Sequence, residues 1–260
     1  NAHVLEEGFG YTYKWDSVEN TLNLVDTKKD ESILPSRYSY YDVGRLGKIK
    51  DQGIYGTCWA FASLTAVETS LMPEEKYDFS EDNMVWNSGY FGAQYDGGDY
   101  TRAISYLASW RGPVLEEDDV YGDGINNSDA GVVKHVQEAQ IIESKNLEAI
   151  KKAVFLYGGV ESSLYTSMSY AGERSMYYND KNYSYCYIGT KKPNHDVVII
   201  GWDDNYSKDN FSVSLEGNGA FICVNSWGDS FGDDGLFYVS YYDSNIGIHN
   251  VVYTRVEDND

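Results

Sequence analysis

Cysteine and proline are scarce in this sequence, with three Cys and four Pro among 260 residues. Three cysteines can form at most one disulfide bridge, which excludes a disulfide framework as the main source of stability. Long apolar runs are also missing, and no stretch approaches the ~20 apolar residues that a membrane-spanning helix needs. The N-terminal residues 1–10 lack the basic region and the apolar core of a signal peptide, so we expect none there.

Basic residues are few compared with acidic ones. Lys and Arg number 20 against 41 Asp and Glu, which gives a formal net charge of −21 at pH 7. A surface this anionic repels phosphate backbones and anionic lipids, so we expect neither nucleic acid nor a membrane surface as a partner. Hydrophobic residues make up 42% and charged residues 23%, a composition typical of a globular chain that can bury a sizeable core.

The order of the sequence patterns indicates an α+β plan. Segment 58–71 is rich in helix formers and apolar on most sides, which predicts a buried, central helix. Segment 76–100 contains several glycines and is predicted to be loop. Two further helices are predicted at 101–110 and 145–157, and β-branched and aromatic runs predict strands at 196–202, 220–225 and 236–242.

Helices in the front part and strands in the back part predict two lobes. The predicted boundaries are an N-terminal extension at 1–33, a mainly helical lobe at 34–130 and a mainly β lobe at 131–260. Residues 1–33 are polar and weakly patterned. We interpret them as an extension laid on the body of the protein or as the remnant of a pro-segment.

Cys58 opens the predicted central helix. Unpaired backbone N–H groups and the helix macrodipole favour an anion at this position. The pKa of the thiol is therefore expected to fall from ~8.5 toward the range of reactive cysteines. The alternative is that Cys58 is a small buried hydrophobe, as free cysteines often are.

The residues around Cys58 favour the reactive thiol over the buried hydrophobe. The run 51–61, DQGIYGTCWAF, strongly resembles the nucleophile segment of the papain-like cysteine proteases. In that family the Gln six residues before the Cys, here Gln52, donates its side-chain amide to the oxyanion. The backbone N–H of Cys58 would supply the second donor. Preorganised donors of this kind suit the charge that develops on a carbonyl oxygen during acyl transfer.

Two later motifs continue the resemblance. The run 194–202, NHDVVIIGW, resembles the family's base segment, which implies that His195 holds the thiolate as an ion pair and later protonates the leaving amine. The run 225–228, NSWG, resembles the motif in which Asn225 orients the imidazole and Trp227 shields that hydrogen bond from water. Taken alone, these runs would indicate a satisfied histidine at a strand end and a tight turn.

The resemblance also implies substrate contacts. Gly97 and Gly98 match the family's substrate strand, where bare backbone pairs with an extended peptide. A loose alignment places Val251 on the floor and Ser163 on a wall of the second pocket from the scissile bond, which favours an apolar or aromatic residue there. Asn194, next to the proposed base, is expected to contact substrate, as is Trp227.

The sequence departs from the family pattern at three places. Plant and animal members carry a second cysteine three residues before the nucleophile, used in a disulfide, and Tyr55 stands there in this chain. Cys223 is expected in the core, whereas Cys186 could be free or bridged to Cys223. The spacing from the base to Asn225 is longer than in most members, and the surplus at 203–219 is expected to be a surface hairpin or loop, similar to bacterial and archaeal cell-surface members.

The resemblance therefore implies a papain-like two-lobe fold, with the catalytic helix in a helical lobe, a β-barrel-like second lobe and a cleft between them. It implies a cysteine endopeptidase that works through a thioester acyl-enzyme, without cofactor or metal. Expected partners are protein or peptide substrates and the chain's own pro-segment, and the expected location is extracellular or at a microbial cell surface. Two alternatives stay open: a catalytically silent papain-like adhesion module, and an acyl transferase of the transglutaminase or amidase kind.

Overall fold

The computed structural model describes residues 11–16, 21–26, 34–89 and 95–259, and the chain divides into two compact units, 1–35 and 36–260. In the first unit β1 (Tyr11–Asp16) pairs antiparallel with β2 (Thr21–Asp26), a hairpin that the weak pattern of this segment had not indicated. The remainder of the predicted 1–33 extension lies outside the described residues. The second unit contains every residue that the sequence places at the active site.

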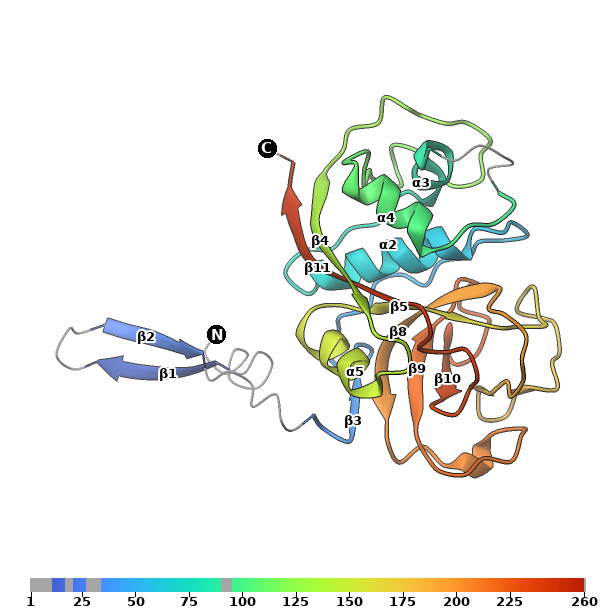
Figure 1. Cartoon of the computed structure of the whole chain (residues 1–260). Coiled ribbons are helices and arrows are strands. Elements are labelled where there is room, and N and C mark those ends of the chain that lie inside the picture. The colour runs from blue at the N-terminus through green and yellow to red at the C-terminus, as the bar shows by residue number, and fades with distance from the viewer. Residues whose placement is uncertain (1–10, 17–20, 27–33, 90–94, 260) are drawn as a thin grey trace. The chain divides into compact units, whose positions relative to one another are not determined.

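Three helices form one part of the second unit: α2 (Cys58–Leu71), α3 (Glu81–Asn87) and α4 (Tyr100–Ala108). The helix α2 is buried along most of its length, which confirms the prediction of a central helix. It lies between α3 and α4 on one side and the sheet on the other (Figure 1). Both parts of the unit therefore pack against α2.

The other part of the unit is built on a sheet whose central strand is β8 (His195–Asp203). This strand pairs with β9 (Ala220–Val224) along one edge, and with β5 (Val160–Leu164) and β3 (Arg37–Ser39) along the other. The remaining elements are β4 (Lys134–Ile142), α5 (Leu147–Leu156), β6 (Tyr178–Asn179), β7 (Ser184–Tyr185), the short 3₁₀ helix η1 (Lys208–Asn210), β10 (Leu236–Ser240) and β11 (Asn250–Asp258).

The sheet is open. Through the described residues its order is β4-β11-β5-β8-β9-β10-β7-β6, with β3 added on β8. All pairs are antiparallel except β10 with β7. The lobe expected to be barrel-like is therefore a mixed sheet that does not close on itself, and α5 packs against β8 and β5.

One prediction of local structure was wrong, and a second was incomplete. Segment 76–100, predicted to be loop, contains α3, which begins after Ser80, whose side chain accepts a hydrogen bond from the Asn83 N–H. Segment 203–219, predicted to be a surface hairpin or loop, is irregular after β8 except for η1, but it also buries Phe211 and Leu215 in a small core with Cys186. The extra residues between the proposed base and Asn225 therefore carry packing of their own.

All three cysteines are free and buried. Cys223 lies in β9 with no exposed surface, as expected for a core position. The two possibilities for Cys186 resolve to a free thiol inside the small core. The second unit is therefore held together by packing and hydrogen bonds and not by cross-links.

Lys50 anchors the segment that leads into the site. Its Nζ lies 2.7 Å from the carboxylate of Glu68 in α2 and 2.8 Å from those of Glu81 in α3 and Asp78. Burial lowers the pKa of Lys50, but the three carboxylates together raise it well above its ordinary value, so the ammonium stays charged. This cluster fixes the chain two residues before Gln52.

Candidate active site

Cys58 is the first residue of α2, and only 8% of its surface is exposed. The preceding residue, Thr57, makes no capping hydrogen bond to the helix, because its hydroxyl pairs with Tyr121 at 2.6 Å. The first N–H groups of a helix have no partner within the helix. The start of α2 therefore keeps donors that can bind a developing negative charge next to the Cys58 sulfur.

The sulfur of Cys58 lies at the beginning of β8. Burial and, to a smaller extent, the nearby Asp196 carboxylate raise the pKa of this thiol to about 12, although the backbone N–H groups of Asp196 and Trp59 oppose the rise by hydrogen bonding. The expectation that the helix start lowers the pKa is therefore wrong for the thiol taken alone, because burial is the larger effect. The hydrogen bond from Asp196 brings the sulfur to the residue that follows His195.

His195 is the first residue of β8, and its Nε2 lies 2.8 Å from Oδ1 of Asn225. The same Oδ1 accepts the Ser226 N–H at 2.8 Å, which identifies it as the amide oxygen. An oxygen can only accept, so Nε2 of His195 must carry the proton. In the neutral ring this leaves the lone pair of Nδ1 free to take a proton from a thiol.

Burial lowers the pKa of His195 to about 4, although the hydrogen bond to Asn225 raises it in part. Cys58 and His195 are thus each more stable in the neutral form when the other carries no charge. A thiolate and an imidazolium can exist here only as a pair, because each charge has to compensate the burial of the other. Proton transfer within the pair leaves its net charge unchanged.

Trp227 covers the imidazole. Its ring centroid lies 4.9 Å from that of His195, at an interplanar angle of 33°, and Phe231 supports it edge-on at 5.0 Å. Both His195 and Trp227 are buried. The hydrogen bond between His195 and Asn225 is therefore kept away from water, where it is stronger.

Gln52 joins the two parts of the unit. Its backbone N–H donates to the Ser226 carbonyl at 2.8 Å, and its side-chain Oε1 accepts the Ser226 hydroxyl at 2.5 Å. One N–H of its Nε2 donates to the Tyr55 carbonyl at 2.7 Å. An amide nitrogen has two N–H groups, so the second stays available for a substrate oxygen.

Gly97 and Gly98 run beside the start of α2. A Cβ on Gly98 would lie 2.5 Å from Nε1 of Trp59, and Gly97 has a φ of +116°, a conformation that favours glycine. The Gly97 carbonyl accepts a hydrogen bond from Arg102 at 2.6 Å. Only a chain without side chains can come this close to Trp59, the neighbour of Cys58.

The remaining predicted residues lie on neighbouring strands. The Ser163 hydroxyl donates to Asp196 at 2.6 Å. Val251 has no exposed surface and pairs with Glu161 in β5, so its side chain shares a sheet face with those of Glu161 and Ser163. The exposed Asn194 exchanges hydrogen bonds of 2.8 and 2.9 Å with the backbone of Thr166, which holds the turn before β8.

Sequence reasoning missed two buried carboxyl groups behind the site, Asp196 and Glu161. Ser63 of α2 donates to Glu161 at 2.6 Å. Burial raises the pKa of Asp196 to about 6 and raises that of Glu161 well above its ordinary value. A signal was present, since Asp196 opens an otherwise apolar run, but its role depends on the register that places Ser163 opposite it.

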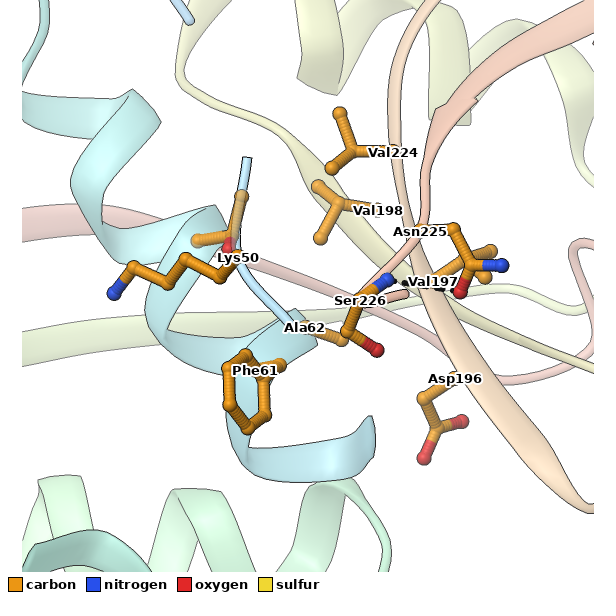
Figure 2. Close-up of a pocket in the computed structure, with 10 residues that line it drawn as sticks. Lys50, Phe61, Ala62, Asp196, Val197, Val198, Val224, Asn225 and Ser226 are labelled. Carbon is orange, nitrogen blue, oxygen red and sulfur yellow. Dashed lines mark hydrogen bonds between the residues drawn. The ribbon is translucent and has the colours of Figure 1, made fainter. Parts of the chain in front are cut away.

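A small cavity of about 10 Å³, of the order that one water needs, lies behind these residues. Figure 2 shows Phe61 and Ala62 of α2 on one side and the β8 and β9 residues on the other, with the hydrogen bond from the Ser226 N–H to Asn225 marked. So little free volume means that helix and strands pack closely directly behind Asn225.

The replacement Asp196→Asn is expected to change how stability depends on pH. Because the native pKa is raised from 3.8 to about 6, the folded state holds this proton more tightly than the unfolded state. The stabilisation is complete below pH ~4 and is lost as the pH rises through about 6. The free energy of unfolding of Asp196→Asn relative to wild type should therefore increase by about 2–3 kcal/mol between pH 4 and pH 7.

Urea unfolding at several pH values measures this difference, with the exposed Asp229→Asn as the matched control. The control should stay parallel to wild type. A constant difference between Asp196→Asn and wild type across this pH range would contradict the prediction.

In the parts of the chain that the structure covers, no group of three or more His, Cys, Asp or Glu side chains is placed to hold a metal ion. The helices found among the described residues are all too short or too polar to cross a bilayer.

Comparison with known proteins adds an independent observation. The sequence profile described as papain family cysteine protease matches residues 34–256. A curated cysteine protease of Blomia tropicalis is 26% identical over 96% of this chain and 73% of its own length. The bromelain protease of Ananas comosus shares the fold with a TM-score of 0.65 at 21% identity, over 85% of this chain and 99% of that one.

The solved structures of Cwp84 are also similar. The clostridial cysteine protease Cwp84 after propeptide cleavage is 33% identical with a TM-score of 0.77, over 86% of this chain and 58% of that one. The protease and lectin-like domains of Cwp84, a surface layer associated protein of Clostridium difficile, are 31% identical with a TM-score of 0.77, over 87% of this chain and 53% of that one. This chain thus spans little more than half of the Cwp84 chains that it matches.

Proposed function

Because this chain belongs to the papain family of cysteine proteases, we propose that it hydrolyses internal peptide bonds with Cys58 as nucleophile and His195 as acid and base. The observation that carries this proposal is the hydrogen bond from Nε2 of His195 to Asn225, since it leaves Nδ1 for the thiol proton. The contact of the Asp196 N–H with the sulfur supports the same assignment.

The reaction proceeds in two halves. Nδ1 of His195 takes the proton of Cys58, and the thiolate attacks the carbonyl carbon of the scissile bond. The oxyanion is bound by the second N–H of Gln52 and by the Cys58 N–H. Collapse of this intermediate expels the amine, which takes the proton from His195, and leaves a thioester on Cys58. A water that gives its proton to His195 then attacks the thioester and releases the acid.

Asn225 and Trp227 keep the imidazole in place through both halves. Asn225 accepts the Nε2 proton and so holds the ring in one rotamer, with Nδ1 left for the thiol proton. Trp227 covers this bond and is the residue that we expect to contact substrate beside the base. A neutral amide suits this role, because a carboxylate would oppose the formation of the nearby thiolate.

Substrate binds as an extended strand along Gly97 and Gly98, because Gly98 passes so close to Trp59 that no side chain fits there. Ser163 and Val251 share a sheet face near the site. Their assignment to a second pocket that takes an apolar or aromatic residue stays a prediction, because Val251 has no exposed surface in this structure. Asn194 holds the turn before β8, the strand that begins with His195, and contacts the substrate beside that base.

The proposal also covers the N-terminal segment, the bounds of the two lobes and the location of the enzyme. Residues 1–33 are an extension or pro-segment remnant, followed by lobes at 34–130 and 131–260. Two findings support a boundary near residue 34. The family match begins at that residue, and the similar Cwp84 structure is described as the protease after propeptide cleavage. An extracellular location at a microbial cell surface is supported by the similarity to a surface layer associated protein.

Labelling with a peptidyl epoxide tests the nucleophile. The reduced chain should gain one equivalent of inhibitor by intact-mass spectrometry, attached to Cys58, because the epoxide needs a thiolate positioned in a peptide-binding cleft. The variant Cys58→Ala keeps Cys186 and Cys223 and should gain none. Equal labelling of this variant, or no labelling of wild type, would favour a catalytically silent binding module.

A second measurement on the same enzyme separates hydrolysis from acyl transfer. A quenched peptide reporter is incubated with and without a primary amine, and the products are analysed by mass spectrometry. We expect the free acid as the main product in both cases. Preferential formation of the amide of the added amine would favour the acyl transferase alternative.

A further inference from the structure

Three tyrosines, Tyr55, Tyr95 and Tyr121, form a cluster beside the loop that carries Gln52. The ring centroids of Tyr55 and Tyr95 lie 4.4 Å apart, with the two rings tilted by 33°, and Tyr121 meets them edge-on at 6.3 and 6.4 Å. Tyr121 also packs edge-on against Phe61 of α2, at 4.8 Å. This tyrosine cluster thus joins three segments that are far apart in the sequence.

The Tyr121 hydroxyl closes the loop 52–57 at both of its ends. It donates to the Gln52 carbonyl at 2.9 Å, so its other contact, with Thr57 Oγ1 at 2.6 Å, must be one in which Thr57 donates. Thr57 immediately precedes Cys58. Burial raises the pKa of Tyr121, so the hydroxyl keeps the proton that this bridge needs.

The other two tyrosines tie the same loop to the segment of Gly97. The side chain of Gln52 donates to the Tyr55 carbonyl at 2.7 Å, and the Gly56 N–H donates to the Tyr95 carbonyl at 2.7 Å. The Tyr95 hydroxyl donates in turn to the buried Asp82 of α3, at 2.8 Å. The loop, the glycine segment and α3 are therefore parts of one hydrogen-bonded assembly.

Ser226 also holds Gln52 at the start of the loop, but the tip of the loop faces solvent. Ile54 at its tip is 95% exposed, and Gly53 adopts a positive φ of +62°. No covalent bridge reaches it, because all three cysteines are free. Yet oxyanion donors are effective only if they are already in place when the charge develops.

We propose that Tyr121 is a positioning residue of the oxyanion hole, whose hydroxyl bridge between Gln52 and Thr57 holds the two donors at their working separation. This inference rests on the proposed function, since it assumes that Gln52 and the Cys58 N–H bind the oxyanion. It goes beyond that function by assigning a role to a residue that touches neither substrate nor nucleophile.

The replacement Tyr121→Phe tests the bridge, because it keeps the ring packing and removes only the hydroxyl. We expect kcat for a peptide reporter to fall about tenfold and KM to change less than twofold. The rate at which iodoacetamide alkylates Cys58 should stay within twofold, since that reaction forms no oxyanion. The control Tyr206→Phe loses a comparable bond, from its hydroxyl to the Asn182 carbonyl at 2.6 Å, and should leave kcat unchanged.

A double-mutant cycle separates positioning from a general loss of structure. In the Gln52→Ala background, Tyr121→Phe should lower kcat by less than threefold, because the donor that it positions is already gone. A full tenfold loss in that background, or an unchanged kcat in Tyr121→Phe alone, would overturn the proposal. If Gln52→Ala itself had no effect, the proposed function would fail instead, and the two failures are distinguishable.

A second variant covers the case in which Tyr121→Phe does not fold. Thr57→Val cuts the same bridge from the other end and retains the Tyr121 hydroxyl. It should lower kcat several-fold with little change in KM or in iodoacetamide reactivity. Wild-type kcat in this variant would overturn the proposal in the same way.

Discussion

Replacing Cys58 by Ala, or His195 by Ala, is expected to lower kcat/KM for a peptide reporter by roughly 10⁴-fold or more. Without the sulfur no thioester can form, and without the imidazole nothing takes the thiol proton at the start of β8. The two residues act as one unit, so the double variant should be no slower than the slower single variant. Initial rates with an internally quenched peptide, measured over a range of substrate concentrations, give these values.

Two controls make the first prediction specific. His135→Ala changes a histidine of β4 and Cys186→Ala changes a thiol of the small core, and both should retain activity within about twofold if folded. Strictly additive losses in the double variant would show that Cys58 and His195 do not share one catalytic step. Full activity of Cys58→Ala would remove the basis of the mechanism.

Gln52→Ala is expected to lower kcat by about 10²–10³-fold, the range found when one oxyanion donor is removed. The effect should fall on kcat and not on KM, because the donor binds the oxyanion and not the planar carbonyl. Alkylation of Cys58 by iodoacetamide should be nearly unchanged, since the thiolate pair remains.

Stability has to be measured beside this rate, because Gln52 also bonds to Ser226 and Tyr55. The free energy of unfolding from urea titration shows whether the variant is intact at the assay temperature. Gln137→Ala, on the exposed face of β4, is the matched control. A raised KM with unchanged kcat would indicate that Gln52 binds the ground state and would contradict the assignment.

The parts of the fold with strong local patterns could be predicted from the sequence. The helix α2 was predicted with its bounds because helix formers run without interruption from Cys58 to Leu71. Its neighbour α3 was missed, since a helix of seven residues in a glycine-containing stretch gives almost no periodic signal. The strand β5 was also missed, because its sequence VESSL is polar although all five of its residues are buried.

The features of the site also fall into those that the sequence predicts and those that only the fold creates. The motifs around Cys58, His195 and Asn225 predict three site residues that the structure places at the start of α2, at the start of β8 and directly after β9, with His195 hydrogen-bonded to Asn225. The effect of burial on the pKa values of Cys58 and His195 could not be predicted, since it depends on how closely α2 packs against β8. The partner of Gln52, Ser226, lies far along the chain, and only the fold brings the two together.

The absence of any cross-link has a practical consequence for the working conditions of this enzyme. A reducing agent keeps the Cys58 sulfur able to react, and in a scaffold stapled by native bridges the same agent would typically cost 2–5 kcal/mol for each bridge lost. Here Tyr55, which packs against Tyr95, stands at the position where plant and animal family members have a bridge cysteine, and all three cysteines are free. A reducing agent therefore has no disulfide of the scaffold to break. A thiol reagent can therefore activate this enzyme without lowering the stability of its fold.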